Sequence, residues 1–333
     1  RTWGTNKIII DSNGLNYQGE DDTYTVEYNT DGETLSIVYA DATKGWIPLN
    51  DDEVTDAPVQ PPTQKGIFGY GSAGGSNVSL TNLVSSSGVV ATDTTGVGTV
   101  RTQLSAASYG GDKAIFGYGG TSSGNVSMTN LVSNSGVVSA DVTGVGSARH
   151  LSAATEYGTD KAIFGYGNSG SVTAVTNLVS NSGVVSTDVS GVGTARYAPA
   201  AAGYGGDKGI FGYGASTPNV SVTNKVSNSG VVAADTSGVG TARRYLAAAS
   251  YGGDKAIFGY GWSSSDPGVS LTNLVSNTGV VAADTTGVGT ARYTLAAAEY
   301  GGDKAIFGYG LASGDVSMTN LVSSSGVVAT DTT

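Results

Sequence analysis

The chain offers few residues that could carry out chemistry. Its 333 residues include no cysteine and one histidine, His150. Thiolates and imidazoles are the usual protein ligands of zinc and copper, so the sequence predicts no such metal site and no disulfide. As a general base, His150 would need a nucleophile and an orienting acid, and no such constellation is recognisable. We therefore expect no enzymatic activity and no cofactor.

Charged residues recur at a fixed spacing. Five times an arginine follows an aspartate by eight residues, in the pairs Asp93–Arg101, Asp141–Arg149, Asp188–Arg196, Asp235–Arg243 and Asp284–Arg292. These pairs could form anion or metal sites, or they could be ion pairs that stabilise the fold. A pair present in every repeat is usually part of the scaffold, so we interpret them as structural. The Asp-Lys pairs in Gly-Gly turns, such as Asp303 and Lys304, have the same interpretation.

Two further motifs have a functional and a structural interpretation. Gly-Val-Gly-Thr/Ser-Ala/Val-Arg has two glycines spaced as in a dinucleotide-binding turn, but it lacks the third glycine and a strand-to-helix unit. It therefore predicts a tight turn between strands. Asn-Val-Ser matches the N-glycosylation acceptor at Asn77, Asn125 and Asn219. The three triplets lie in the same loop of three repeat copies, so they count as little more than one match.

These motifs belong to six repeats of a β-rich unit. The repeats align on the phenylalanine of Ile-Phe-Gly-Tyr-Gly, at spacings of 48, 48, 47, 47 and 49 residues: Phe68, Phe116, Phe164, Phe211, Phe258 and Phe307. Glycine and Ser-Gly steps divide each repeat into four short apolar pieces. Four strands at this period predict a β-propeller. We expect an all-β fold in which residues 65–333 close into six four-stranded blades, with each phenylalanine packed between neighbouring blades.

Two segments of each repeat resemble the kelch repeat. The sequence from Lys255 to Gly261 is similar to the apolar kelch strand that ends in a glycine doublet, here Gly-Tyr-Gly. Arg292, followed by an alanine-rich run, is similar to the arginine-led opening strand of kelch. Val-Val-x-x-Asp stands in the region of the kelch tryptophan. The resemblance implies a six-bladed kelch-like β-propeller over residues 65–333.

Residues 1–57 form a different, acidic region. They hold 12 acidic and 3 basic residues, a net charge of −9 out of −11 for the chain. Runs at 22–28 and 34–39 flank an Asp-Gly pair and predict a hairpin, with a final strand in 40–49. This small β-rich module resembles the end of a module in tail-fibre and other structural proteins of marine and cyanobacterial phages, and the Phe-Gly-Tyr-Gly repeats resemble arrays in such proteins. Prolines predict a semi-rigid linker at residues 58–64.

Charge and hydropathy limit the partners of the chain. Neither region has the basic stripe that nucleic-acid binding needs, so we expect no nucleic-acid partner. No run of about 18 apolar residues occurs, and we expect no membrane insertion.

The loop after Phe-Gly-Tyr-Gly differs most between repeats. In a propeller these loops lie on one face, which is therefore the expected recognition face. Trp262 in one of these loops could stack on a sugar, or it could pack on a neighbouring loop or subunit. The candidate ligand-binding residues are Trp262, Asn125, Asn219, Asp266 and Asp315. The position of His150 varies between repeats, which predicts that this residue is exposed.

The resemblances imply a structural or adhesive appendage protein, such as a phage fibre or virion surface component. It would be extracellular or on the virion surface, would self-associate, and would present a propeller to a host or a cell-surface glycan. The alternative is a secreted bacterial kelch-like carbohydrate-binding or surface-adhesion protein. A propeller enzyme is a third possibility, but copper-radical oxidases of kelch type need missing His and Cys ligands. A hydrolase would need an asymmetric pair of carboxylates, and four carboxylates break the repeat pattern: Glu156, Glu299, Asp266 and Asp315.

One blade should lack a strand. There are six Phe-Gly-Tyr-Gly strands but five Gly-Val-Gly…Ala-Ala segments, because residues 57–64 precede the first strand instead. An open strand edge invites pairing, so we expect it to be covered. The chain starts at Arg1 and ends at Thr333 within a repeat, and we interpret it as part of a longer polypeptide. We expect residues beyond Thr333 to supply the strand, and the acidic module to mediate fibre-type homo-oligomerisation; an N-terminal strand or a neighbouring subunit is the alternative donor.

Overall fold

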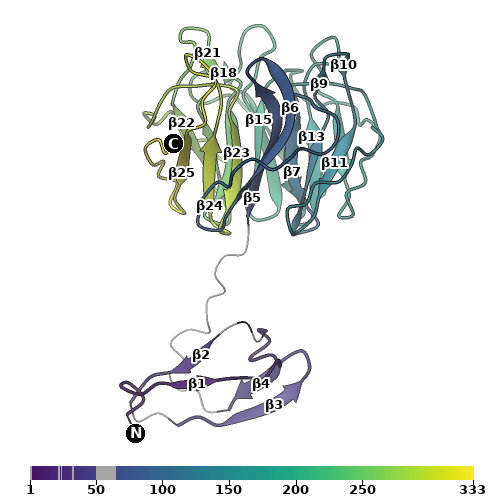
Figure 1. Cartoon of the computed structure of the whole chain (residues 1–333). Helices are drawn as coiled ribbons and strands as arrows, with labels where there is room; N and C mark the ends of the chain where they lie inside the picture. Colours follow the sequence, from purple (N-terminus) through teal and green to yellow (C-terminus); the bar gives the residue numbers. More distant parts are fainter. Residues whose placement is uncertain (1, 22, 24, 32–33, 50–64) are drawn as a thin grey trace. The chain divides into compact units, whose positions relative to one another are not determined.

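The computed structural model describes residues 2–21, 23, 25–31, 34–49 and 65–333. All secondary structure in these ranges is β, in small antiparallel sheets (Figure 1), which confirms the predicted all-β class. The chain divides into two compact units, Arg1–Pro61 and Pro62–Thr333. The predicted linker at residues 58–64 lies outside the described residues.

The N-terminal unit pairs its strands differently from the prediction. Strand β2 (Val26–Tyr28) pairs with β1 (Ile8–Ile10), so the predicted hairpin between residues 22–28 and 34–39 is wrong. The Tyr28 hydroxyl lies 2.6 Å from that of Tyr17 in a buried position. This contact holds β2 against the segment that precedes it, which a local Asp-Gly signal could not reveal.

The second hairpin of this unit forms around an aspartate turn. Strand β3 (Ile37–Asp41) pairs with β4 (Gly45–Pro48). The Asp41 carboxylate accepts hydrogen bonds from the backbone N–H groups of Thr43 and Lys44, at 2.8 and 2.7 Å. These bonds close the turn and lower the pKa of Asp41, and they account for the strand predicted in residues 40–49.

Five repeats of the second unit each form a three-stranded antiparallel sheet. An alanine-rich strand pairs with the Ile-Phe-Gly strand, which pairs with the Thr-Asn-x-Val strand. The sheets are β7 (Ser105–Tyr109), β8 (Lys113–Gly117) and β11 (Thr129–Val132); β12 (Ala153–Tyr157), β13 (Lys161–Gly165) and β14 (Thr176–Val179); β15 (Ala200–Tyr204), β16 (Lys208–Gly212) and β17 (Thr223–Val226); β19 (Ala247–Tyr251), β20 (Lys255–Gly259) and β22 (Thr272–Val275); and β23 (Ala296–Tyr300), β24 (Lys304–Gly308) and β25 (Thr319–Val322).

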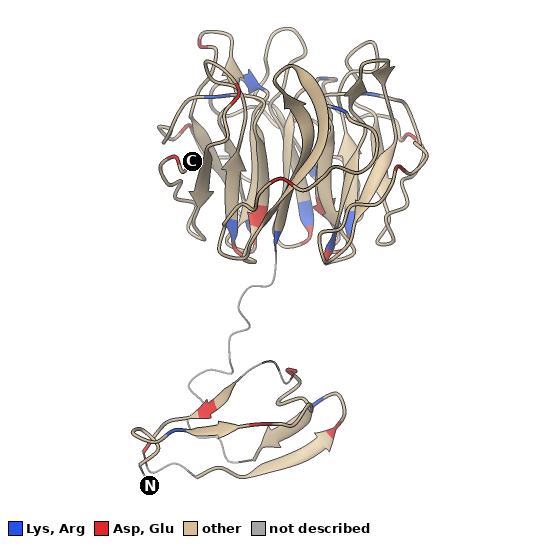
Figure 2. Ribbon diagram, in the orientation of Figure 1, with Lys and Arg blue, Asp and Glu red and all other residues tan. Residues whose placement is uncertain are grey.

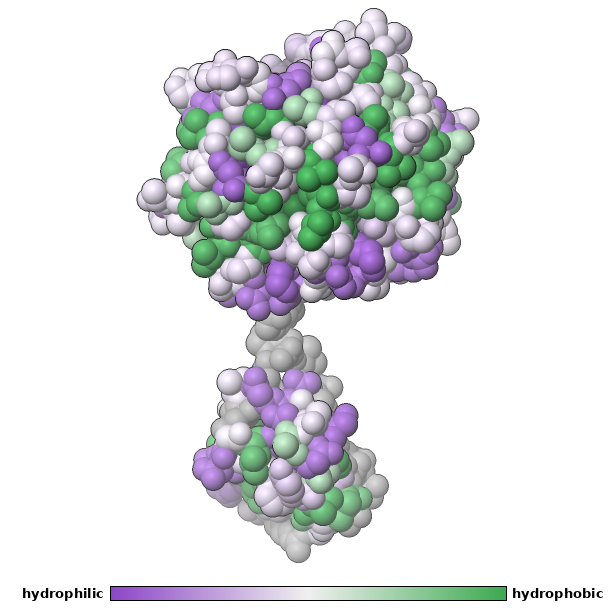
Figure 3. Space-filling view, turned by 90° about the vertical axis from the view of Figure 1, so that its right-hand side faces the viewer, coloured by the Kyte–Doolittle hydropathy of each residue, from purple (hydrophilic) through white to green (hydrophobic). Residues whose placement is uncertain are grey.

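The fourth predicted strand of each repeat is reduced to isolated bridges. In the second repeat these join Val132 to Val138 and Thr129 to Val142. The apolar piece is only two valines long and follows Gly136, whose φ of 81° turns the chain away from the strand. One valine faces inward and the other outward. The outward valines are 61–66% exposed: Val89, Val137, Val184, Val231, Val280 and Val327. Figure 3 shows apolar surface across one flank of the unit.

The repeated phenylalanines pack between consecutive repeats. The ring of Phe164 meets that of Tyr118 edge-on at 5.1 Å between centroids. A Cβ on Gly117 would lie 2.7 Å from Phe164 Cζ, so the glycine admits the ring. The same aromatic pair joins the other consecutive repeats, and Phe68 of the first repeat meets Tyr309 of the last at 5.2 Å.

The first repeat lacks an alanine-rich strand among the described residues. It consists of β5 (Gly66–Ala73) and β6 (Ser76–Val84). The alanine-rich strands of the other repeats lie side by side in the order β7, β12, β15, β19 and β23, and β23 also contacts β5. Ala296 of β23 is exposed, whereas its counterparts Ala153, Ala200 and Ala247 are 5–6% exposed. The exposed alanine marks a place that no strand of the described residues covers.

Candidate functional site

A buried arginine anchors the loop end of each of the five junctions that join one repeat to the next along the chain. Arg243 has no exposed surface, and its guanidinium lies 4.4 Å from the centroid of the Tyr213 ring. Its Nε donates to the Tyr260 carbonyl at 2.8 Å, Nη1 to the Thr241 carbonyl at 3.2 Å, and Nη2 to Asn273 Oδ1 at 2.7 Å. Arg101, Arg149, Arg196 and Arg292 occupy the equivalent places.

These arginines do not pair with the aspartates that precede them in sequence. Arg243 lies 3.7 Å from Asp284, not beside Asp235, and the same shift pairs Arg101 with Asp141 and Arg292 with Asp331. Asp235 belongs to the preceding junction, where it accepts hydrogen bonds from Thr194. The predicted eight-residue pairing is therefore wrong, because consecutive aspartate and arginine serve successive junctions.

The variable loops carry all five predicted ligand-binding residues, and the side chains of three of them bond an adjacent repeat. Asn125, in β10 (Gly124–Asn125, paired with β9, Gly120–Thr121), donates from Nδ2 to the Asn168 carbonyl at 3.1 Å. Asn219 donates to the Trp262 carbonyl at 3.3 Å. Asp315 accepts from the Gly74 N–H at 3.2 Å. These side chains therefore tie each loop to the next.

His150 lies in one of these loop junctions. Its Nδ1 is 2.7 Å from Asn125 Oδ1, and the residue is half-buried. Burial lowers the pKa of the imidazole. The predicted exposure of His150 is therefore wrong: the position varies between repeats, but its side chain packs between loops.

Trp262 lies in an aromatic cluster around a second arginine. Strand β18 (Arg243–Arg244) pairs with β21 (Trp262–Ser263). The Arg244 guanidinium is 4.3 Å from the Trp262 ring centroid, 5.3 Å from that of Tyr245 and 5.5 Å from that of Tyr197. Its Nη1 donates to the Tyr197 hydroxyl at 2.6 Å, while its buried Nε has no hydrogen-bond partner within the described part of the chain. One face of the predicted tryptophan platform is thus covered by Arg244.

Asp266 lies at the exposed tip of the same loop. Its carbonyl accepts from the N–H groups of Ser263 at 3.2 Å and Gly268 at 2.9 Å, which shapes the turn. Its carboxylate makes no hydrogen bond or ion pair with the described residues. The structure therefore brings Asn219, Trp262 and Asp266 together in adjacent loops, and it places Asn125 and Asp315 at other junctions.

The sequence analysis missed the residues that surround Trp262. Tyr197, Arg244 and Tyr293 occupy the same position in three consecutive repeats, directly after the buried arginine. Tyr245 extends the cluster to Tyr293, with ring centroids 6.3 Å apart. The sequence signal for this cluster was the large side chain at this position in three consecutive repeats.

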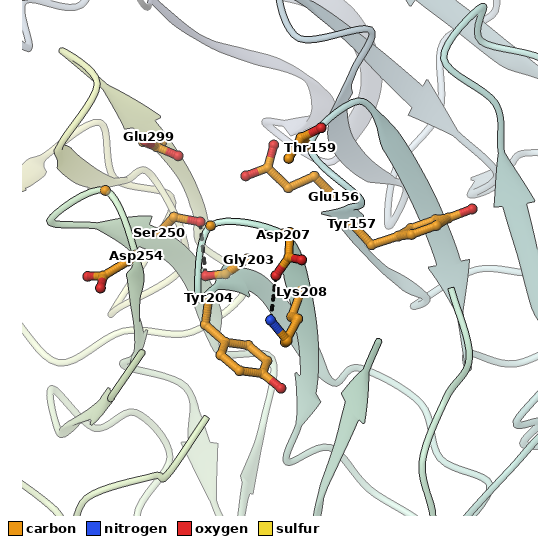
Figure 4. Close-up of a pocket in the computed structure, with 12 residues that line it drawn as sticks. Glu156, Tyr157, Thr159, Gly203, Tyr204, Asp207, Lys208, Ser250, Asp254 and Glu299 are labelled. Atoms are coloured by element: carbon orange, nitrogen blue, oxygen red, sulfur yellow. Dashed lines mark hydrogen bonds and ion pairs between the residues drawn. The ribbon is translucent and has the colours of Figure 1, made fainter. Parts of the chain in front are cut away.

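A small cavity of about 50 Å³ lies near the Asp-Lys turns, at the end of the alanine-rich strands away from the variable loops. Figure 4 shows the residues that line it. Glu156, Gly203, Ser250 and Glu299 line it from the alanine-rich strands. Burial raises the pKa of Glu156. β15 and β19 come between the strands of the two glutamates, so these carboxylates do not belong to neighbouring strands.

Positions of basic and acidic residues gather around this end of the repeats in the ribbon diagram (Figure 2). Each Asp-Lys pair of the Gly-Gly turns forms an ion pair of 2.5–2.9 Å between Nζ and Oδ1, as the structural interpretation predicts. Exposed pairs of this kind contribute little to stability, because solvent screens the charges.

Scans against protein-family models and curated proteins return no match for this chain. Within the described ranges, no group of three or more His, Cys, Asp or Glu side chains is placed to hold a metal ion. No helix in the same ranges has the length and apolar character needed to cross a membrane.

Proposed function

We propose that residues 65–333 form a closed six-bladed β-propeller that acts as a non-enzymatic recognition module of an extracellular appendage. Two contacts between the first and last repeats support closure. Phe68 meets Tyr309 at 5.2 Å, as each phenylalanine meets the tyrosine of the repeat before it. At the loop end, Gly74 donates its N–H to Asp315 at 3.2 Å.

The proposed ligand is a carbohydrate bound at the loop end of the fourth and fifth repeats. The observation that carries this proposal is the cluster of Tyr197, Tyr245 and Trp262 around Arg244. Aromatic rings offer apolar faces for sugar rings, and a guanidinium offers charge-assisted hydrogen bonds to a carboxylate. The cluster therefore favours glycans that contain an acidic sugar, with the Asp266 carboxylate available to accept from hydroxyl groups.

Glycan-array binding followed by calorimetry tests this function on the full chain. We expect Trp262→Ala to weaken binding at least tenfold, about 1.4 kcal/mol, and Arg244→Gln to weaken binding of acidic glycans selectively. Val231→Ala, an exposed change on the flank, is the matched control and should bind as the unchanged protein does. Equal binding by Trp262→Ala, or no binding to any neutral or acidic glycan, would refute the proposal.

The exposed valines favour self-association as a second property of the module. Their 61–66% exposure leaves apolar side chains in water at equivalent points of all six repeats. Sedimentation analysis should show association that rises with concentration, and Val231→Lys with Val280→Lys should weaken it. A monomer at all concentrations would contradict this proposal and leave the glycan proposal standing.

A further inference from the structure

The junction between the last and first repeats lacks a component that the other five junctions share. Each of the five contains a Gly-Val-Gly-Thr/Ser-Ala/Val-Arg segment, and its arginine stacks on a tyrosine. No arginine among the described residues stacks on Tyr309, and residues 50–64 contain no lysine or arginine. We call this place the arginine socket and define it by Asn82, Asp93, Tyr309 and Gly310.

The junction at Arg292 is a filled counterpart of the socket. It shows which contacts the arginine side chain makes there. Nη2 donates to Asn320 Oδ1 at 2.6 Å, and Nη1 lies 3.6 Å from Asp331 Oδ1. The guanidinium lies 4.3 Å from the centroid of the Tyr260 ring. The arginine thus satisfies an amide oxygen, a carboxylate and an aromatic face at once.

The backbone of the same segment is bonded as well. The Arg292 carbonyl accepts from the Gly261 N–H at 3.0 Å, and the Val288 carbonyl accepts from the Tyr260 hydroxyl at 3.0 Å. Thr290 donates to the Asp331 carboxylate from its N–H and its hydroxyl, at 2.9 and 2.7 Å. These contacts make the junction specific for this sequence, because they need the side chains of both Thr290 and Arg292.

The arginine socket presents the same groups without their partners. Asn82 donates from Nδ2 to the Ala91 carbonyl at 3.0 Å and to Asp93 Oδ1 at 2.8 Å, matching the bonds of Asn320. This orients Asn82 Oδ1 as in the filled junctions, but no described residue donates to it. The Tyr309 hydroxyl and the Gly310 N–H likewise have no hydrogen-bond partner among the described residues.

Burial and charge also distinguish the socket from its counterparts. Asn82 and Tyr309 are half-buried, whereas the corresponding asparagines and four of the corresponding tyrosines have no exposed surface. Of the residues that the structure describes, Asn82 alone bonds Asp93, whereas Asp331 has an arginine and a threonine as partners besides Asn320. The socket is therefore a preformed site with an uncompensated negative charge.

We propose that the arginine socket binds one further Gly-Val-Gly-Thr-Ala-Arg segment with its alanine-rich strand, in the register set by Asp331. Each repeat places an arginine eight residues after its aspartate and stacks it on its own tyrosine, as Asp284, Arg292 and Tyr260 do. The same register after Asp331 leads to Tyr309. The occupant is thus a continuation of the repeat pattern, and its alanine-rich strand covers the edge of β5. This inference does not depend on the glycan proposal.

A peptide with the sequence of residues 287–300 tests the socket directly, with fluorescence anisotropy on the 333-residue chain. We expect saturable binding at one peptide per chain. Replacing the peptide arginine with alanine should weaken binding at least thirtyfold, because a buried guanidinium makes several charge-assisted hydrogen bonds. Replacement with lysine should also weaken it, since an ammonium cannot reproduce the planar fork.

Variants of the chain locate the binding. Asn82→Ala and Asp93→Asn should each weaken binding at least tenfold, while Asp266→Asn, an exposed carboxylate outside the socket, should leave it unchanged. Asp93 is exposed, so its variant should keep the unfolding temperature of the parent. No binding, equal binding of a scrambled peptide, or unchanged binding by both socket variants would overturn the proposal.

A second arm tests the source of the segment. A chain extended after Thr333 by Gly-Val-Gly-Thr-Ala-Arg and an alanine-rich strand should no longer bind the peptide and should unfold at a higher temperature. An extended chain that binds the peptide as tightly as the 333-residue chain would show that the register argument is wrong.

Discussion

Replacing Arg243 with methionine should destabilise the repeat unit strongly. Methionine has a similar length but no donors, so the carbonyls of Tyr260 and Thr241 and the amide oxygen of Asn273 lose their partners. Each buried acceptor without a donor costs about 1–3 kcal/mol. Asp284 is partly exposed, so the loss of its 3.7 Å ion pair adds little. We expect the free energy of unfolding to fall by about 3–5 kcal/mol.

Urea unfolding followed by circular dichroism and tryptophan fluorescence measures this change. Arg149→Met is a matched comparison, because Arg149 Nε has no hydrogen bond whereas Arg243 Nε bonds the Tyr260 carbonyl. We expect Arg149→Met to cost about 1 kcal/mol less. Arg244→Met, which removes one hydrogen bond to the Tyr197 hydroxyl, is the neighbouring control. A loss below about 1 kcal/mol for Arg243→Met would refute the view that the buried fork joins two repeats.

Three further predictions concern packing and titration. Phe211→Ala should cost about 3–5 kcal/mol in chemical denaturation, because the ring is buried between repeats; unchanged stability would contradict that packing. Burial raises the pKa of Tyr213 and Tyr260 to about 12, above the unfolded value of about 10. Ultraviolet titration should therefore show that these tyrosines ionise late, and the free energy of unfolding should fall as the pH rises from about 10 to about 12. A flat stability curve in this range would contradict the burial of the two hydroxyls. Burial also raises the pKa of Glu156. Glu156→Gln should therefore stabilise the protein at neutral pH, and should not stabilise it in acid below the unfolded pKa of about 4.3. An equal rise in melting temperature at both pH values would argue against a charge effect.

The sequence alone determined the features that depend on local pattern and repetition. The short apolar pieces between glycine and Ser-Gly steps predicted the all-β class. The recurrence of Phe211 and its counterparts predicted a packed residue in each repeat. The count of segments predicted that the first repeat lacks a strand, and residues 65–333 contain none at that place. These predictions succeeded because strand formation and turns respond mainly to neighbours in the sequence.

The tertiary structure decided which partners meet. Arg243 pairs with Asp284 and not with Asp235, and Val26–Tyr28 pairs with a strand that precedes it. Arg244 covers the ring of Trp262, which the sequence offered as a free platform. Such contacts depend on how segments that are separated in the chain align with one another in space. Local composition cannot fix that alignment, because several segments of equal chemistry compete for each partner and only packing selects among them.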